Sequence, residues 1–75
     1  MNKAEFIDSI KKLRTDFELN NDNWDSQTIP EYLEAIERYA EDIQGYYDNT
    51  NQNINAEVAN WKIFADIMKG ASIYE

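Results

Sequence analysis

Apolar side chains recur at alternating intervals of four and three residues along most of this 75-residue chain. An α-helix turns about 100° per residue, so this spacing places the side chains on one helix face. The most regular run consists of Ile29, Leu33, Ile36, Ala40, Ile43 and Tyr47. Sustained two-residue alternation and β-branched runs, which indicate strands, are missing from the sequence. The chain is therefore predicted to be all-α.

Two Asn-rich stretches, at residues 20–23 and 49–55, divide the chain into three helical segments. Asn2 with Glu5, and Thr28 with Pro30 and Glu31, are typical of helix N-termini. We predict helices over residues 3–19, 29–47 and 54–72, packed as a compact three-helix bundle in a single helical domain, residues 1–75. Leu33 and Trp61 occupy core positions in this scheme, so replacing either by Ala is expected to cost about 2–5 kcal/mol.

The amino-acid inventory excludes several kinds of chemistry. The chain has no His and no Cys, which removes zinc sites built on them, disulfides, thiol nucleophiles and imidazole-dependent catalytic triads. The Asn-rich segment from Asn49 fails as a calcium loop, because Ile54 stands where Gly is needed and Asn60 where Glu is needed. We predict no metal, no cofactor and no enzymatic activity.

Charge placement is the most informative functional feature. Of the formal net charge of −8, residues 20–50 carry −7, from eight acids against Arg38, whereas residues 1–19 are neutral overall. Clustered carboxylates attract basic proteins and repel phosphate, so direct nucleic-acid binding is not expected. An equally simple interpretation is a solvated face that keeps a small protein soluble.

Three tyrosines at intervals of seven, Tyr32, Tyr39 and Tyr46, are expected along the edge between the apolar and acidic stripes of the second helix. There they would seal the core or anchor a partner. The candidate partner-binding residues are Glu34, Glu37, Glu41, Asp48, Tyr32, Tyr39, Tyr46, Asp22 and Asp25.

Trp24 lies in the polar connection before the second helix, between Asp22 and Asp25. We expect its ring to fold back onto the second and third helices as a plug for the core. The alternative is an exposed platform for a cation or a sugar.

The sequence favours a binding or regulatory protein for a basic protein partner, of the toxin-neutralising or enzyme-inhibiting type. Two alternatives stay open: a nucleic-acid mimic, and a structural module that forms a homodimer through Ile63, Ile67 and Tyr74. The longest apolar runs span two or three residues, so we expect no membrane segment and a cytoplasmic location.

Scattered aromatic and capping residues carry a family resemblance. They are the segment Trp24-Asp25-Ser26-Gln27-Thr28-Ile29, the segment Tyr32-Leu33-Glu34-Ala35, the pair Tyr46-Tyr47, Trp61, Ala65 and the terminal Ile73-Tyr74-Glu75. With these residues the chain resembles a family of small uncharacterised bacterial helical domains, marked by a Trp-Asp/Glu-Asn/Ser-x-Thr-Ile/Leu motif and a C-terminal Tyr-Glu. The resemblance implies a compact helical domain with structural tryptophans, and it implies no activity.

Overall fold

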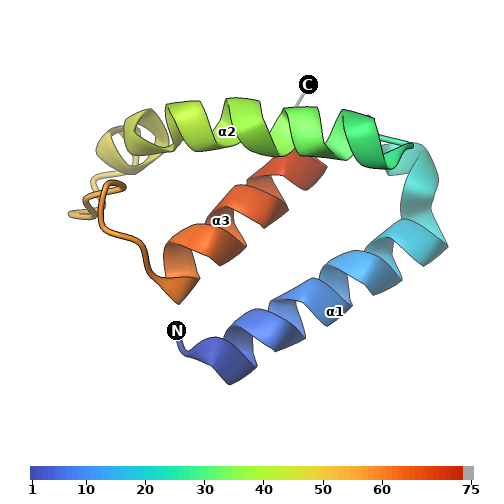
Figure 1. Ribbon diagram of the computed structural model, residues 1–75, viewed down its shortest axis with the longest axis horizontal. Helices are drawn as coiled ribbons and strands as arrows, with labels where there is room; N and C mark the ends of the chain where they lie inside the picture. The colour runs from blue at the N-terminus through green and yellow to red at the C-terminus, as the bar shows by residue number, and fades with distance from the viewer. Residues whose placement is uncertain (74–75) are drawn as a thin grey trace.

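The computed structural model describes residues 1–73 and contains three helices (Figure 1). They are α1 (Lys3–Asn20), α2 (Ile29–Asn49) and α3 (Trp61–Ser72), with a short 3₁₀ turn, Asn21–Asn23, after α1. No strand occurs among the residues described. The prediction of an all-α three-helix bundle is confirmed.

The helix starts follow the capping signals in the sequence. At α1 the Asn2 side chain accepts from the Glu5 amide at 2.8 Å, and the Glu5 carboxylate accepts from the Asn2 amide at 3.1 Å. At α2 the Thr28 hydroxyl accepts from the Glu31 amide, and Pro30 stands in the first turn. Side chains thus satisfy amides that have no partner inside the helix.

The predicted start of the third helix at Ile54 is wrong, because α3 begins only at Trp61. Asn60 caps it by accepting from the Ile63 amide at 2.9 Å. The preceding loop is fixed by Gln44 of α2, whose side chain donates to the Ile54 carbonyl at 2.9 Å and accepts from the Ala56 amide at 2.8 Å. The Gln44 side chain thus gives hydrogen-bond partners to the Ile54 carbonyl and the Ala56 amide, so these two groups need no partner in a helical turn.

α3 lies between the other two helices and packs against both (Figure 1). Within residues 1–73, no Cα atom of α1 comes within 8 Å of one in α2. The core forms between α2 and α3 from Ile43, Tyr47 and Ile63, with Tyr39, Ile54, Ala56 and Ile67 packed against it. In the described chain α1 contributes no buried side chain, since its apolar residues Phe6, Ile10, Leu13 and Phe17 are half-buried.

Two residues expected on an outward flank of the third helix lie inside the bundle. Ile63 is 3% exposed and Ile67 packs against the core, so both side chains are already used within the chain. Tyr74, the third member of that predicted dimer contact, and the closing Glu75 lie outside the described residues. α3 is therefore shorter than predicted, and the apolar spacing did not reveal which side of it faces the core.

A polar cluster lies beside the core. The Tyr47 ring is fully buried, and its hydroxyl donates to Asp66 Oδ2 at 2.7 Å. Lys62 Nζ donates to the same oxygen at 2.6 Å and lies 5.3 Å from the centre of the Tyr47 ring. The cluster ties the C-terminal half of α2 to α3.

No helix in the described part of the chain combines the length and apolarity needed to cross a membrane.

The two glycines allow a matched test of helix packing. A Cβ at Gly70 would overlap the Tyr39 ring, whereas a Cβ at Gly45 would meet nothing within 4 Å. We expect Gly70→Ala to lower the free energy of unfolding by about 1–3 kcal/mol through overpacking. Gly45→Ala should raise it by up to about 1 kcal/mol, because Ala favours the helix. Urea unfolding of both variants checks the pair, and equal effects would contradict the close approach of α2 and α3.

Because the Tyr47 hydroxyl is buried, we expect the folded protein to lose stability at alkaline pH. Burial raises its pKa above the ordinary 10.0, and the hydrogen bond to Asp66 raises it further. Because the folded state favours the neutral hydroxyl, this contribution is complete below about pH 10 and is lost as the pH rises toward the folded-state pKa. Denaturant unfolding between about pH 8 and 12 measures it.

Tyr47→Phe serves as the control for that decline. It should be less stable near neutral pH by about 1–3 kcal/mol, because the bond to a charged acceptor is lost. Its alkaline decline should be shallower, though not absent, since burial also raises the pKa of Tyr32 and of Tyr39. An unchanged alkaline decline would show that Tyr47 is not the titrating group.

Candidate protein-interaction surface

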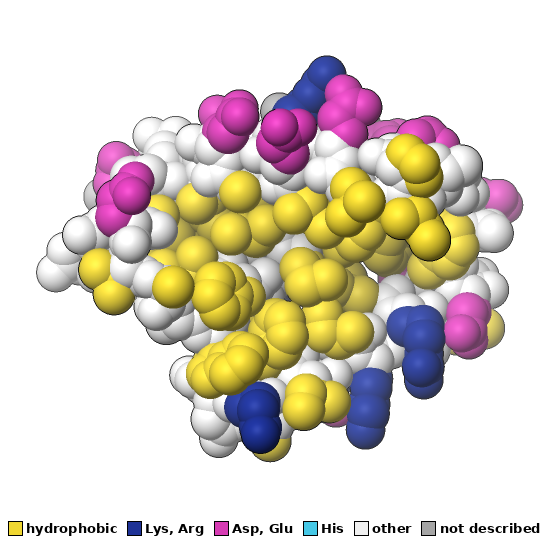
Figure 2. Space-filling model, in the orientation of Figure 1, with side chains coloured by type: hydrophobic (Ala, Val, Ile, Leu, Met, Phe, Trp, Pro, Cys, Tyr) yellow, Lys and Arg dark blue, Asp and Glu magenta, His cyan; other side chains and the backbone are white. Residues whose placement is uncertain are grey.

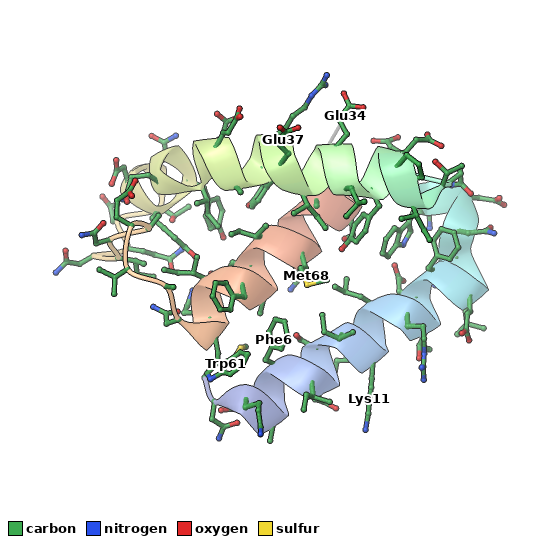
Figure 3. The ribbon with its side chains drawn as sticks, viewed as in Figure 1. Phe6, Lys11, Glu34, Glu37, Trp61 and Met68 are labelled. Carbon is green, nitrogen blue, oxygen red and sulfur yellow. The ribbon has the colours of Figure 1, made fainter. Side chains whose placement is uncertain are left out.

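The acidic residues of α2 form a one-sided surface. Glu34, Glu37, Glu41 and Asp48, here named the acidic stripe, fall within an arc of about 60° at 100° per residue. All four are exposed, and the labelled Glu34 and Glu37 point away from the bundle (Figure 3). Glu34 pairs with Arg38 at 2.6 Å, and Asp48 accepts from Gln44 at 3.1 Å. All four carboxylates lie outside the core between α2 and α3 and are exposed to solvent, so a partner can reach them.

Asp22 and Asp25 lie in the connection before α2, and both are exposed. Within residues 1–73, no hydrogen bond or ion pair joins either of them to the acidic stripe. They add negative charge near the start of α2 and stay candidates for the same surface.

The three tyrosines lie elsewhere than expected. On the helix wheel their centre is about 170° from that of the acidic stripe, so they do not edge it. Tyr32 donates its hydroxyl to the Met68 carbonyl at 2.7 Å, and the Tyr39 ring packs on Gly70. Tyr46 is 44% exposed beside Tyr47. Tyr32 and Tyr39 therefore join α2 to α3, which agrees with their expected role at the core boundary.

Burial accounts for the shifted titration of two of these tyrosines. It raises the pKa of Tyr32 and, together with the nearby Tyr46 and Asp66, the pKa of Tyr39. Both hydroxyls therefore stay neutral to a higher pH than the hydroxyl of a tyrosine in water.

Trp24 acts as the expected plug, although its ring contacts differ from the prediction. The residue is 8% exposed, and its ring centre lies 5.2 Å from that of Phe17 in α1 and 5.6 Å from that of Tyr32 in α2. Its Nε1 donates to Asp16 Oδ2 at 2.7 Å. Trp24 therefore joins α1 to α2, and a ring so buried is not an open platform for a cation or sugar.

The structure reveals an exposed apolar face that the apolar spacing assigned to the core. Leu33 is 57% exposed and Trp61 38% exposed, in contrast to the prediction for both. Ile29, which lines the same cavity as Leu33, and Phe64, whose ring contacts Trp61, are also exposed, at 76% and 40%. Side chains of this kind gather across all three helices in Figure 2. The name apolar face is used below for the exposed Ile29, Leu33, Trp61 and Phe64 together with the half-buried Phe6 and Met68.

Aromatic contacts hold one end of the apolar face together. The Phe6 ring centre lies 5.3 Å from that of Trp61 and 6.5 Å from that of Phe64. The rings of Trp61 and Phe64 are nearly perpendicular, with centres 6.0 Å apart. At the other end a cavity of about 250 Å³ lies between α1 and α2, lined by Phe17, Trp24, Ile29, Tyr32 and Leu33 among others.

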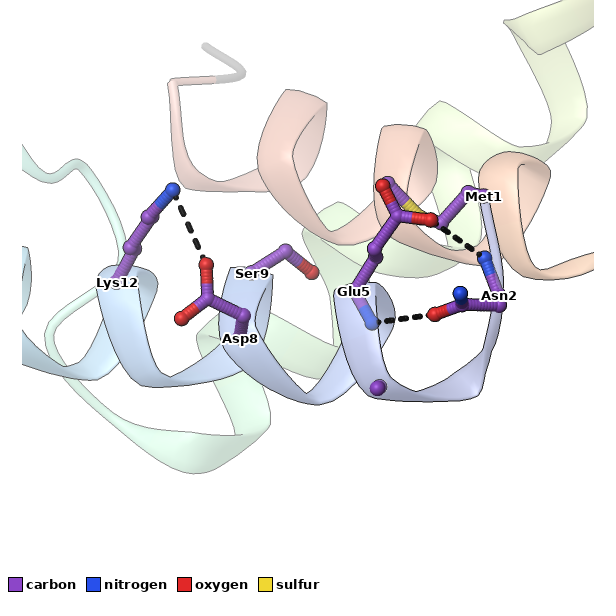
Figure 4. A pocket seen from close by; sticks show the side chains of 7 residues that line it. Met1, Asn2, Glu5, Asp8, Ser9 and Lys12 are labelled. Atoms are coloured by element: carbon purple, nitrogen blue, oxygen red, sulfur yellow. Dashed lines mark hydrogen bonds and ion pairs between the residues drawn. The ribbon is translucent and has the colours of Figure 1, made fainter.

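A second concave surface covers the first turns of α1, with a volume of about 440 Å³ (Figure 4). Its polar side chains bind one another, since Asn2 and Glu5 form the helix cap and Lys12 pairs with Asp8 at 3.1 Å. Among residues 1–73, no group of three or more potential metal ligands comes together. We find no arrangement in this surface that selects a ligand.

These observations define a small all-α domain with one acidic helix face and one exposed apolar face. The chain belongs to a family of unknown function, DUF7660, whose model matches residues 2–75. No curated protein and no solved structure matches the chain. The expected membership in a family of unknown function is therefore confirmed.

Because Leu33 is exposed, replacing it should affect the free energy of unfolding much less than replacing a core residue. Leu33→Ala should change the free energy of unfolding by no more than about 0.5 kcal/mol, because its side chain is largely in water. Ile43→Ala should cost about 2–5 kcal/mol, since Ile43 is 3% exposed. Denaturant unfolding compares the two, and similar costs would place Leu33 in the core.

Proposed function

We propose that this protein is a non-enzymatic binding module that docks a basic protein partner on the acidic stripe of α2. The observation that carries the proposal is the separation of roles on this helix. Core contacts use Ile43, Tyr47 and the packed tyrosines, whereas the acidic stripe points away from α3. An exposed surface outside the core, on which one charge sign gathers, suits electrostatic docking.

Charge supports the proposal at long and at short range. The stripe belongs to the segment that carries −7 of the net −8, so its field is directional and steers a basic partner toward one side. In contact, each exposed pair contributes about 0.2–1 kcal/mol, so a cluster of pairs is needed for affinity. A toxin-neutralising or enzyme-inhibiting role is compatible with such docking.

Nucleic-acid mimicry is the less favoured function. The carboxylates of the acidic stripe rise by uneven steps of about 4.5, 6 and 10.5 Å along the helix axis. Phosphates repeat evenly along a strand. The uneven spacing suits a protein surface better than a groove that binds a phosphate chain. Two further parts of the proposal are a bacterial origin, which the sequence resemblance suggests, and a cytoplasmic location, which the short apolar runs suggest.

Reversal of the acidic stripe tests the proposal. The variant Glu34→Lys, Glu37→Lys, Glu41→Lys should keep its helical circular dichroism and lose capture of basic proteins from an extract of the source cells. Immobilised wild type should retain those proteins at low salt and release them as added salt screens the contact. Mass spectrometry of the bound proteins provides the comparison.

A matched control separates the stripe from net charge. The variant Asp8→Lys, Glu18→Lys, Glu57→Lys reverses three other exposed acids, so its net charge changes by the same amount. It should keep the captured proteins. Equal loss in both variants would show that overall charge, and not the acidic stripe, determines capture.

A further inference from the structure

The apolar face lacks a partner within the chain. Ile29, Leu33, Trp61 and Phe64 are exposed. Hydrophobic side chains gather over all three helices on the side of the molecule that Figure 2 shows, whereas single exposed apolar residues would need no explanation. The side chains of Phe6, Trp61 and Met68 lie between α1 and α3 in Figure 3. A contiguous patch of this kind, contributed by three helices, is typical of an interface.

Opposite charges border the apolar face along its two long edges. On α2 the acidic stripe follows it, with Glu37 about 40° from Leu33 on the helix wheel. On α1 a basic edge follows it, formed by Lys3, Lys11 and Arg14, which lie within about 80° of one another. Figure 2 shows acidic side chains above the apolar surface and basic ones below it.

The basic edge is available for contacts outside the chain. Lys3, Lys11 and Arg14 are exposed, and in the described chain neither Lys3 nor Lys11 forms an ion pair. Arg14 lies 4.0 Å from Glu18, at the limit of an ion pair. Lys12, which points to another side of α1, is the lysine that pairs with Asp8.

We propose that the apolar face binds a second copy of this chain, with a two-fold axis in the interface that runs along the face between α1 and α2. Rotation about that axis brings the basic edge of each copy against the acidic edge of the other. Every contact then occurs twice, as two-fold symmetry requires. The face is thus complementary to itself in charge as well as in apolarity.

The packing of the bundle favours a second copy. Among residues 1–73 the buried apolar side chains are Trp24, Ala35, Ile43, Tyr47, Ile63, Ala65 and Ala71, three of which are alanines. A chain of this size buries only about 60% of its unfolded surface, and oligomerisation is one remedy where disulfides and metals are missing. A dimer across the apolar face would bury the half-exposed rings that hold α1 to α3.

The dimer leaves room for the proposed function. Glu37 is the stripe residue nearest the apolar face, whereas Glu34 and Glu41 are turned further round α2 by about 60° and 40°. The outer carboxylates of the two copies would lie on opposite sides of the dimer. Each dimer would therefore offer two acidic docking surfaces.

Sedimentation equilibrium and light scattering between about 1 μM and 1 mM test the proposal. We expect the molar mass to rise with concentration toward twice the 8.8 kDa of one chain. Leu33→Ser should weaken the dimer at least about tenfold, because a polar side chain replaces an apolar one within the contact. The matched control is Leu19→Ser, at a residue that is 76% exposed on another side of α1.

Charge reversal tests the symmetry. Lys11→Glu and Glu37→Lys should each weaken the dimer at least about tenfold, since each places like charges opposite one another. The double variant Lys11→Glu, Glu37→Lys should restore it, because opposite charges again stand opposite one another at these two positions. Asp42→Lys, on another side of α2, should leave the dimer unchanged. Circular dichroism confirms that each variant folds.

Three results would overturn the proposal. A chain that stays monomeric at about 1 mM leaves the apolar face to a different protein. A dimer insensitive to Leu33→Ser and to both single reversals forms through another surface. A double reversal that fails to restore the dimer excludes the pairing of the two edges.

Discussion

The contact between α2 and α3 around Tyr47 supports the rest of the structure. The Tyr47 ring is buried in one cluster with Ile43 and Ile63. Its hydroxyl donates to the Asp66 carboxylate, which also accepts a hydrogen bond from Lys62. A buried hydroxyl without an acceptor would cost about 1–3 kcal/mol, so the Asp66 bond is what allows a tyrosine at this position. Tyr39 and Gly70 extend the same contact toward the end of α3.

The helices could be predicted from the sequence because their signals are local. Capping at Asn2 and Thr28 and the four-three apolar spacing depend on residues a few positions apart. The start of α3 could not be predicted in this way, since Gln44, in the preceding helix, fixes the loop at Ile54 and Ala56. The apolar spacing continued through residues that a long-range side-chain contact holds outside the helix.

The carboxylates of the candidate surface could be predicted from the sequence, whereas the tyrosines and Leu33 could not. Carboxylates such as Glu34 and Glu41 are exposed wherever the apolar side of their helix is buried, so their periodicity placed them correctly. The tyrosines required knowledge of where α3 lies, because Tyr32 and Tyr39 turn toward it. Leu33 was misplaced because periodicity finds the apolar side of a helix, and does not show whether another element covers it. The exposed apolar residues of α2 and α3 could be recognised only once the structure showed that α1 and α2 do not pack against each other.

The shallow packing of α1 affects how the molecule moves. In the described chain this helix contributes no buried side chain, and beyond its contacts with α3 it is tied to the bundle by Trp24 and Asp16. Segments with few buried apolar contacts open at a smaller free-energy cost than the global unfolding of the protein. The α1 amides should therefore exchange their hydrogens sooner than those of α2 and α3, through openings that leave the Tyr47 contact intact. α2 and α3 thus form a stable helical hairpin, to which α1 is more loosely attached.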